Sequence, residues 1–141
     1  MVIRGGKVTG CYLSHTIEKY ATMLAQMSKK EHRLKQFRQF ENSRRQLFEG
    51  VDISSYPENT TAHIHFVAKN KDNTATKQQK YELALKYFSI QRESGFKKMT
   101  SRSTNLKLIG HLKNFGFRVL KEVNFESKGQ IFPQFLVEID L

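Results

Sequence analysis

The sequence predicts an α/β domain of mixed α+β type, in which a mixed sheet carries helices on its faces and follows two basic helices. The second half alternates short β-type runs with amphipathic helical runs, whereas the first half has helical spacing throughout. The length of 141 residues, with 38% apolar and 26% charged residues, suits one hydrophobic core. We therefore expect a single domain, 1–141, with a helical basic part at 1–50 and a sheet-containing part at 60–141.

Two helices are predicted in the first half. Apolar residues follow helical spacing from Leu13 to Leu24, and Ser14 is placed to cap the helix start. The second helix follows Ser28 in "KKEHRLKQFRQFENSRRQLF", where an apolar side opposes a side rich in lysine and arginine. Gly50 suits the end of this helix.

The second half is predicted to begin with a strand, a helix and a strand. β-Branched and aromatic residues alternate in "TTAHIHFVAK", which is typical of a strand. The helical run is "TKQQKYELALKYFSIQRESG", and Gly95 ends it. Its predicted buried face holds Tyr81, Ala84, Leu85 and Phe88. The run "FKKMTSR" predicts a short strand.

The last part is predicted to be a helix and two strands. The helix is "STNLKLIGHLKNFG", with Leu108, Ile109, Leu112 and Phe115 buried and Gly116 at its end. The strands are "FRVLKEVNFE" and "QIFPQFLVEIDL", and the turn "SKG" between them indicates an antiparallel hairpin. Pro133 cannot donate to a ladder, so this part of its strand should lie at an edge or bulge. Helices between the other strands indicate crossovers and parallel pairing.

The charge is the strongest feature of the composition. Twenty-four lysines and arginines against 13 acids give a net charge of +11, which attracts polyanions. We expect nucleic acid or an acidic protein surface as the partner; a basic protein with no anionic partner is the alternative. No base-reading motif is recognisable. The predicted polyanion-binding residues are Lys29, Lys30, Arg33, Arg38, Arg44, Arg45, Lys97, Lys98 and Arg102.

Several classes of protein are excluded by simple patterns. The longest apolar runs are far below 18 residues, so no membrane span is expected. The N-terminal run "MVIRGGKVTGCYL" lacks a continuous apolar segment, so we expect no secretory signal peptide. Cys11 is the single cysteine and cannot form an internal disulfide, which favours an intracellular setting or a particle assembled inside a cell.

The histidines of one predicted strand and the single cysteine each have a possible chemical role and a plain structural one. His63 and His65 lie on one face of a predicted strand, which is usable metal-ligand spacing, but no third ligand is evident. We expect surface or edge histidines and no metal. Nothing beside Cys11 marks a cysteine nucleophile, so we expect a small, partly buried side chain.

The stretch "NLKLIGHLKNFGF" carries a family resemblance. Asn105, Ile109, Gly116 and Phe117 stand at the spacing of the last conserved block of the GNAT superfamily of N-acyltransferases, and the chain resembles that superfamily over about 62–141. The resemblance implies a GNAT-like β-α-β-α-β-β part, with an acyl-CoA bound where two neighbouring strands splay apart. Asn105 is a candidate cofactor contact.

The chain departs from the GNAT pattern at two functional positions. The segment that should cradle the cofactor pyrophosphate, "NKDNTATKQQK", has no glycine; Thr74, Thr76 and Lys77 are the candidate contacts. The family tyrosine that often acts as general acid falls on Leu112, which cannot donate a proton. His111 is the remaining catalytic candidate, although a solvated helix residue is expected there.

A third departure concerns the first half of the chain. The strand-helix-helix-strand-strand half with which the family opens is not visible; the two basic helices stand in its place, and "MVIRGGKV" supplies one short strand at best.

A narrower resemblance suggests a role. The pattern of "NLKLIGHLKNFGF" is similar to that of small GNAT-like internal virion proteins of short-tailed phages. It favours a non-catalytic, virion-associated structural or interaction protein, located in the host cytoplasm or the virion, that needs no cofactor and contacts nucleic acid, an acidic protein or other virion proteins. Two alternatives stay open: an active acyl-CoA-dependent N-acyltransferase that uses acetyl-CoA, and a basic nucleic-acid-binding module.

Overall fold

A computed structural model describes residues 2–4, 7–28, 35–52, 55–69 and 75–141. Its elements in chain order are β1 (Val2–Arg4), β2 (Lys7–Thr16), α1 (Ile17–Ser28), α2 (Lys35–Phe48), β3 (Thr61–Lys69), α3 (Lys77–Glu93), β4 (Lys98–Ser103), α4 (Leu106–Asn114), β5 (Arg118–Ser127) and β6 (Gln130–Asp140).

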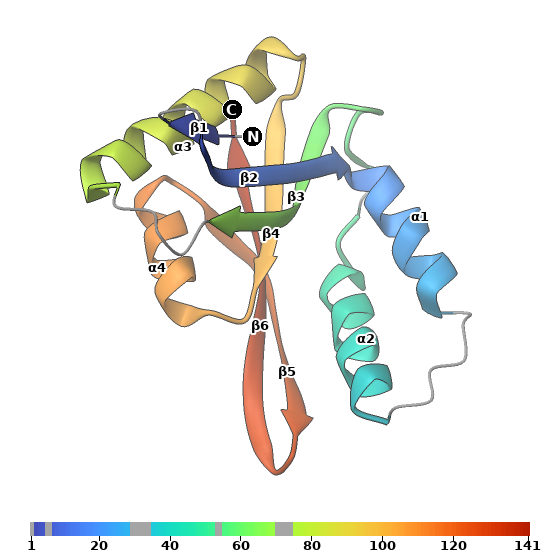
Figure 1. Cartoon of the computed structure of the whole chain (residues 1–141). Helices are drawn as coiled ribbons and strands as arrows, with labels where there is room; N and C mark the ends of the chain where they lie inside the picture. The colour runs from blue at the N-terminus through green and yellow to red at the C-terminus, as the bar shows by residue number, and fades with distance from the viewer. Residues whose placement is uncertain (1, 5–6, 29–34, 53–54, 70–74) are drawn as a thin grey trace.

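The strands form one six-stranded sheet in the order β1-β2-β3-β4-β6-β5. Among the described strands only β3 and β4 pair in parallel, and the other neighbours pair antiparallel. The parallel pairing expected across α4 is wrong, because β6 lies between β4 and β5. Helices α1 and α2 lie on one side of this sheet and α3 and α4 on the other (Figure 1). The predicted mixed α/β fold is confirmed.

The start of the chain corrects the prediction of a helix from Leu13. Strands β1 and β2 form an antiparallel hairpin, and β2 pairs with β3 from Gly10 to Thr16. Helix α1 begins only at Ile17, so the part predicted as helical, 1–50, opens with strands. The segment "KVTGCYLSHT" is rich in β-branched and aromatic residues, and it covers an edge of β3 that would otherwise be bare.

The two faces of the sheet differ in polarity. The face toward α3 and α4 is apolar, because alternate residues of β3, β4 and β6 form the main hydrophobic core with both helices. The face toward α1 and α2 is polar but equally buried. Its buried polar side chains are Thr61, His63, Thr100, Gln134 and Glu138, and they lie with Ile17, Tyr20 and Leu47.

The predicted apolar face of α3 is partly wrong. Phe88 is buried as expected, but Tyr81 and Leu85 remain 46% and 44% exposed. The residues of α3 that pack on the core are Ala84, Tyr87 and Phe88, a stripe rotated from the predicted one. Tyr81 instead stacks on Phe115, with ring centroids 4.9 Å apart.

Helix α4 likewise buries only part of the apolar face that we predicted. Ile109 is buried, and Leu112 packs partly buried against the core. Leu108, which we predicted to be buried, is 43% exposed. In a helix of only nine residues the core-facing stripe is narrow, and Leu108 falls beside it.

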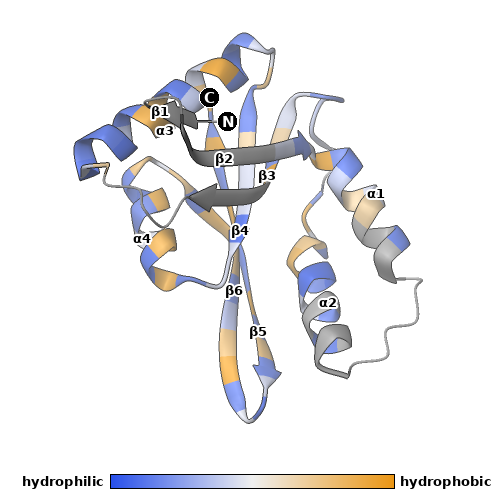
Figure 2. Cartoon of the chain, in the orientation of Figure 1, coloured by the Kyte–Doolittle hydropathy of each residue, from blue (hydrophilic) through white to orange (hydrophobic). Residues whose placement is uncertain are grey.

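The β5–β6 hairpin projects beyond the sheet (Figure 1). Strand β4 pairs with β6 only from Phe135 to Asp140, so the β4-facing edge of β6 is open around Pro133, as predicted for this proline. The projecting part carries hydrophobic segments, coloured orange in Figure 2. Ile131, near the start of β6, is 71% exposed. Phe125 and Phe132 stack across the hairpin with ring centroids 5.4 Å apart.

Candidate functional site

The central strands of the sheet separate along their length. Strands β3 and β4 pair in parallel only between Thr61–Ile64 and Lys98–Ser101. Beyond this point β3 continues to Lys69 paired with β2, and β4 continues to Ser103 paired with β6. Among the described residues, the β4-facing edge of β3 therefore has no strand partner after Ile64. We call this divergence the strand opening.

A β-bulge explains where the strand opening starts. The β2–β3 ladder pairs Ser14 with Ile64 and Leu13 with Phe66, so His65 is left without a partner in the register. A bulge bends its strand and increases its twist. This one turns β3 at the residue where pairing with β4 ends, and the two strands part.

A row of polar side chains crosses the sheet just before the opening. The register aligns His15 with His63, His63 with Thr100, Thr100 with Glu138, and Glu138 with Arg118. His63 Nδ1 lies 2.8 Å from Thr100 Oγ1, and both side chains are fully buried. The expectation of a surface or edge histidine is therefore wrong for His63, because α1 and α2 cover this face.

Tyr20 of α1 joins the covering helices to the polar row. Its ring stacks on His63 with centroids 3.9 Å apart, and Phe48 packs edge-on against His63. The Tyr20 hydroxyl accepts hydrogen bonds from Arg44 Nη2 at 2.9 Å and from Arg102 Nε at 2.7 Å. One phenol thus ties together α1, α2 and β4.

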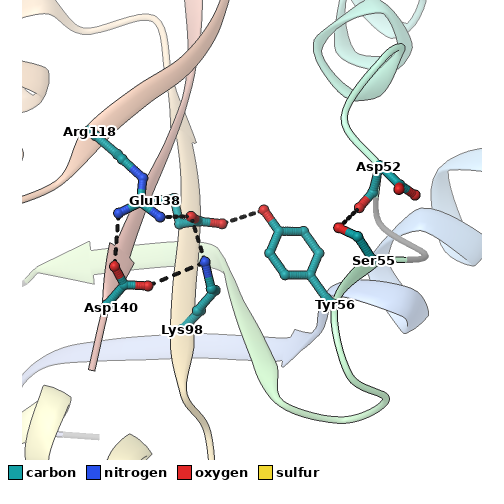
Figure 3. A network of polar contacts seen from close by, with 7 residues as sticks. All are labelled: Asp52, Ser55, Tyr56, Lys98, Arg118, Glu138 and Asp140. Carbon is teal, nitrogen blue, oxygen red and sulfur yellow. Dashed lines mark hydrogen bonds and ion pairs between the residues drawn. The ribbon is translucent and has the colours of Figure 1, made fainter.

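A second network surrounds Glu138, which lies beside Thr100 in the same polar row (Figure 3). Glu138 is 2% exposed and accepts hydrogen bonds from the Tyr56 hydroxyl and from Arg118 Nη2. Lys98 Nζ lies 3.1 Å from Glu138 Oε1 and 3.3 Å from Asp140 Oδ1. Arg118 Nη1 completes the network at 2.8 Å from Asp140 Oδ2. Glu138 and Asp140 therefore contact the same two cations, Lys98 and Arg118.

The network shifts the ionisation of its members. Burial, followed by the hydrogen bond to Glu138, raises the pKa of Tyr56 to about 12. The hydrogen bonds from Arg118 and Lys98 hold the pKa of Asp140 below its usual value. The neutral phenol and the ionised Asp140 are thus the forms that suit the folded chain.

We expect a tyrosine-dependent loss of stability in alkali. Unfolded Tyr56 loses its proton near pH 10, whereas the folded chain holds it to about pH 12. Its stabilising contribution is therefore complete below pH 10 and disappears as the pH rises toward 12. Chemical denaturation from pH 8 to 12 should show the wild type losing more stability than Tyr56→Phe; parallel curves would contradict this.

The predicted cofactor contacts are divided between described and undescribed parts of the chain. Thr74 lies outside the described residues. Thr76 is the N-cap of α3: its hydroxyl accepts from Gln79 N at 3.2 Å, and the Gln79 side chain accepts from Thr76 N at 3.1 Å. Lys77 is exposed in the first turn of α3. Asn105 caps α4. Capping thus uses both Thr76 and Asn105.

The candidate catalytic position on α4 stays without support. His111 is exposed, and Leu112 contacts the hydrophobic core. The chain therefore has an apolar contact where the family pattern has a hydroxyl.

The predicted polyanion-binding residues do not form one described surface. Arg44 is 6% exposed, which corrects its placement at the surface, and it bonds Tyr20. Lys98 and Arg102 make the internal contacts given above. Arg45 and Lys97 are exposed. Lys29, Lys30, Arg33 and the side chain of Arg38 lie outside the described residues, and so does the side chain of His65.

Within the part of the chain that the structure describes, no group of three histidine, cysteine or acidic side chains is placed to hold a metal ion. No described helix is long and apolar enough to span a bilayer.

The sequence reasoning missed the buried polar face. Its signal was the alternation at the end of β6. There the polar residues Glu138 and Asp140 alternate with the apolar residues Val137, Ile139 and Leu141. In β4, which reads KMTSRS, every residue except Met99 is polar. Two such strands, when adjacent, create a polar layer.

Comparison with solved structures identifies the fold. A Drosophila melanogaster polyamine N-acetyltransferase matches 99% of this chain and 72% of its own, with a TM-score of 0.76 at 10% identity. An agmatine N-acetyltransferase matches 99% and 74%, with a TM-score of 0.71 at 11% identity. A mosquito arylalkylamine N-acetyltransferase-like protein matches 94% and 68%, with a TM-score of 0.69 at 11% identity. The chain has the GNAT acetyltransferase fold.

The GNAT fold extends further along the chain than the sequence indicated. The structural match includes β2, α1 and α2, although we expected the family's opening half to be absent. No protein-family model and no curated protein matches the sequence. The narrower resemblance to phage internal virion proteins stays a prediction.

Proposed function

We propose that this GNAT-fold chain is an acyl-CoA-dependent N-acyltransferase. The observation that carries the proposal is the strand opening, where β3 runs on from Ile64 to Lys69 and no described strand pairs with its β4-facing edge. The pantetheine arm of coenzyme A is extended and contains two amides, which suits pairing with an open strand edge. The matched structures are named as enzymes that acetylate amines, which supports the same class of reaction.

The residues around the opening suit the chemistry of acyl transfer. An acyl-CoA supplies the activated acyl group as a thioester. The edge of β3 would hold the arm in an extended form, and α1 and α2 keep water from the polar face. His63 and Thr100 form a buried hydrogen-bonded pair next to Ile64 and Ser101, the last residues that pair before the strands part. We infer that His63 takes the proton that the attacking amine loses.

The test combines binding with turnover. Isothermal titration with acetyl-CoA should give a micromolar Kd, and thiol release with a panel of amines should show turnover. His63→Gln should lower kcat about 100-fold or more while the Kd for acetyl-CoA stays the same. Asp140→Asn, on the far side of the face, is the matched control. Absence of acetyl-CoA binding at millimolar concentration would overturn the proposal.

Leu112 favours a second candidate, the non-catalytic phage-type protein. Its apolar side chain cannot protonate a leaving thiolate, and the net charge of +11 favours contact with nucleic acid or an acidic partner in a virion. A plain nucleic-acid-binding module would use the same positive charges. Its affinity for nucleic acid should therefore depend on salt as that of the phage-type protein does.

The salt dependence of DNA binding tests this second candidate. Fluorescence anisotropy with duplexes of unrelated sequence should show an affinity that falls at least 1,000-fold, on the order of six phosphate contacts, between 50 and 200 mM salt. A DNA affinity that does not change with salt concentration would contradict the second candidate. Acetyl-CoA binding with turnover would favour the enzyme instead.

A further inference from the structure

The projecting part of the β5–β6 hairpin has one covered face and one open face. Helix α2 packs against β5 and β6 on the covered face (Figure 1). Gln134 on this face is buried and bonds Ser43 of α2, and Val123 opposite it is half-buried. The side chains that point the other way are exposed, except for a half-buried proline. They are Glu122, Asn124, Glu126, Ile131 and Pro133, and we call this set the open hairpin face.

The open hairpin face lies on the side of the sheet that carries α4. Phe135 of β6 is buried in the main core with Ile109 of α4. Alternate residues of a strand share a face, so Pro133 and Ile131 continue the row of Phe135. The β5 residues of the open hairpin face lie opposite this row in the ladder. Helix α4 thus covers this side of the hairpin only as far as Phe135, and a step one helix deep follows (Figure 1).

Apolar groups are exposed on both sides of this step. Ile131 is 71% exposed, and Leu106 and Leu108 of α4 are 64% and 43% exposed. Gly110 is exposed in the middle of α4, where glycine weakens a helix, and a methyl group there would meet no neighbouring atom within 4 Å. Packing within the described chain therefore does not require this glycine. Its lack of a side chain lets another surface approach α4 closely.

The two sides of the step carry opposite charge. The open hairpin face contains two carboxylates and no cation, whereas α4 contains Lys107 and Lys113, both exposed, and no acid. Among the described residues, no ion pair involves these lysines or Glu122 and Glu126. A chain of net charge +11 repels a second copy over much of its surface. The acids of the hairpin instead attract the lysines that a second copy carries on α4.

We propose that two copies of this chain associate about a two-fold axis, with α4 of each copy lying on the open hairpin face of the other. The step is complementary to itself, because each α4 fills the space beside the other α4, in one layer between the two sheets. The exposed leucines of α4 cover Ile131, and the lysines of α4 lie against Glu122 and Glu126. Each contact occurs twice, as a two-fold axis requires.

Sedimentation velocity of the full-length chain in about 150 mM salt tests this association. The wild type should pass from monomer to dimer between micromolar and near-millimolar concentration, because one helix and one hairpin form a small interface. The double variants Glu122→Lys/Glu126→Lys and Lys107→Glu/Lys113→Glu should each dimerise at least about tenfold more weakly, because like charges then meet. An equimolar mixture of the two should restore the dimer, since both of its contacts again join lysine to glutamate.

Two further variants separate the contact from general effects of charge. Ile131→Ser changes no charge and should also weaken the dimer about tenfold or more, because it removes an apolar contact on each side of the axis. Lys80→Glu/Lys86→Glu, on the exposed part of α3, is the matched control. It changes the net charge as much as the α4 variant does and should dimerise like the wild type.

A wild type that stays monomeric at every concentration would overturn the proposal, as would a dimer that either the hairpin or the α4 double variant forms as readily as the wild type. A mixture of those two variants that stays monomeric would also overturn it, and recovery of the dimer in the mixture would show that both are folded. A series of species larger than a dimer would overturn the two-fold axis. The experiment uses no acyl-CoA, so its outcome does not depend on the proposed enzymatic function.

Discussion

Phe88→Ala should lower the free energy of unfolding by about 3–5 kcal/mol, because it empties the centre of the main core. Phe88 is 9% exposed, and its ring contacts Phe115 edge-on at a centroid distance of 5.6 Å and Phe117 at 6.0 Å. These neighbours come from α4 and its junction with β5, so the cavity would open between elements that local relaxation cannot easily bring together. Urea denaturation followed by circular dichroism measures the loss.

Leu85 offers a matched control on the same helix. It lies three residues before Phe88 and is 44% exposed, so Leu85→Ala removes little buried surface. Its expected cost is below about 1 kcal/mol. Similar losses for both variants would show that α3 is rotated relative to the stripe Ala84, Tyr87 and Phe88.

The second large effect is expected at Glu138. Glu138→Ala removes a carboxylate that is 2% exposed and leaves the Tyr56 hydroxyl and two cations without their shared acceptor. A broken buried ion pair costs several kcal/mol, but Lys98 and Arg118 are 30% and 50% exposed and regain water. We therefore expect a loss of about 2–3 kcal/mol in urea denaturation at pH 7.

Asp140 isolates the contribution of burial in this network. It bonds the same Lys98 and Arg118 as Glu138 does, but it is 62% exposed. Asp140→Ala should cost at most about 1 kcal/mol, because exposed ion pairs are weak. If Glu138→Ala and Asp140→Ala lose equal stability, then charge rather than burial determines how much each carboxylate stabilises the fold.

The elements after residue 60 were predictable because each has a clear period. Strands β3 to β6 and helices α3 and α4 appear in the predicted order. Strand β2 was not predictable in this way, because Leu13 and Ile17 happen to stand four residues apart, as they would in a helix. Pairing with β3, whose partner residues lie 46 to 59 positions later in the chain, decided its structure.

The candidate site was less predictable than the fold. The polar row joins five strands through register, so His15, His63, Thr100, Glu138 and Arg118 become neighbours only once the strand order is known. The arginines were predicted as surface cations from their charge alone. Burial of Arg44 depends on how α2 packs on the sheet, and no local pattern encodes that packing.

Deletion of a single residue of β3 would separate folding from the proposed binding of acyl-CoA. Deleting His65 leaves every other residue of β3 opposite its present partner in β2, because the ladder already skips that residue. The strand would then be regular and straight, and its pairing with β4 would continue past Ile64. The chain would keep its sheet while losing the open strand edge to which we propose that acyl-CoA binds.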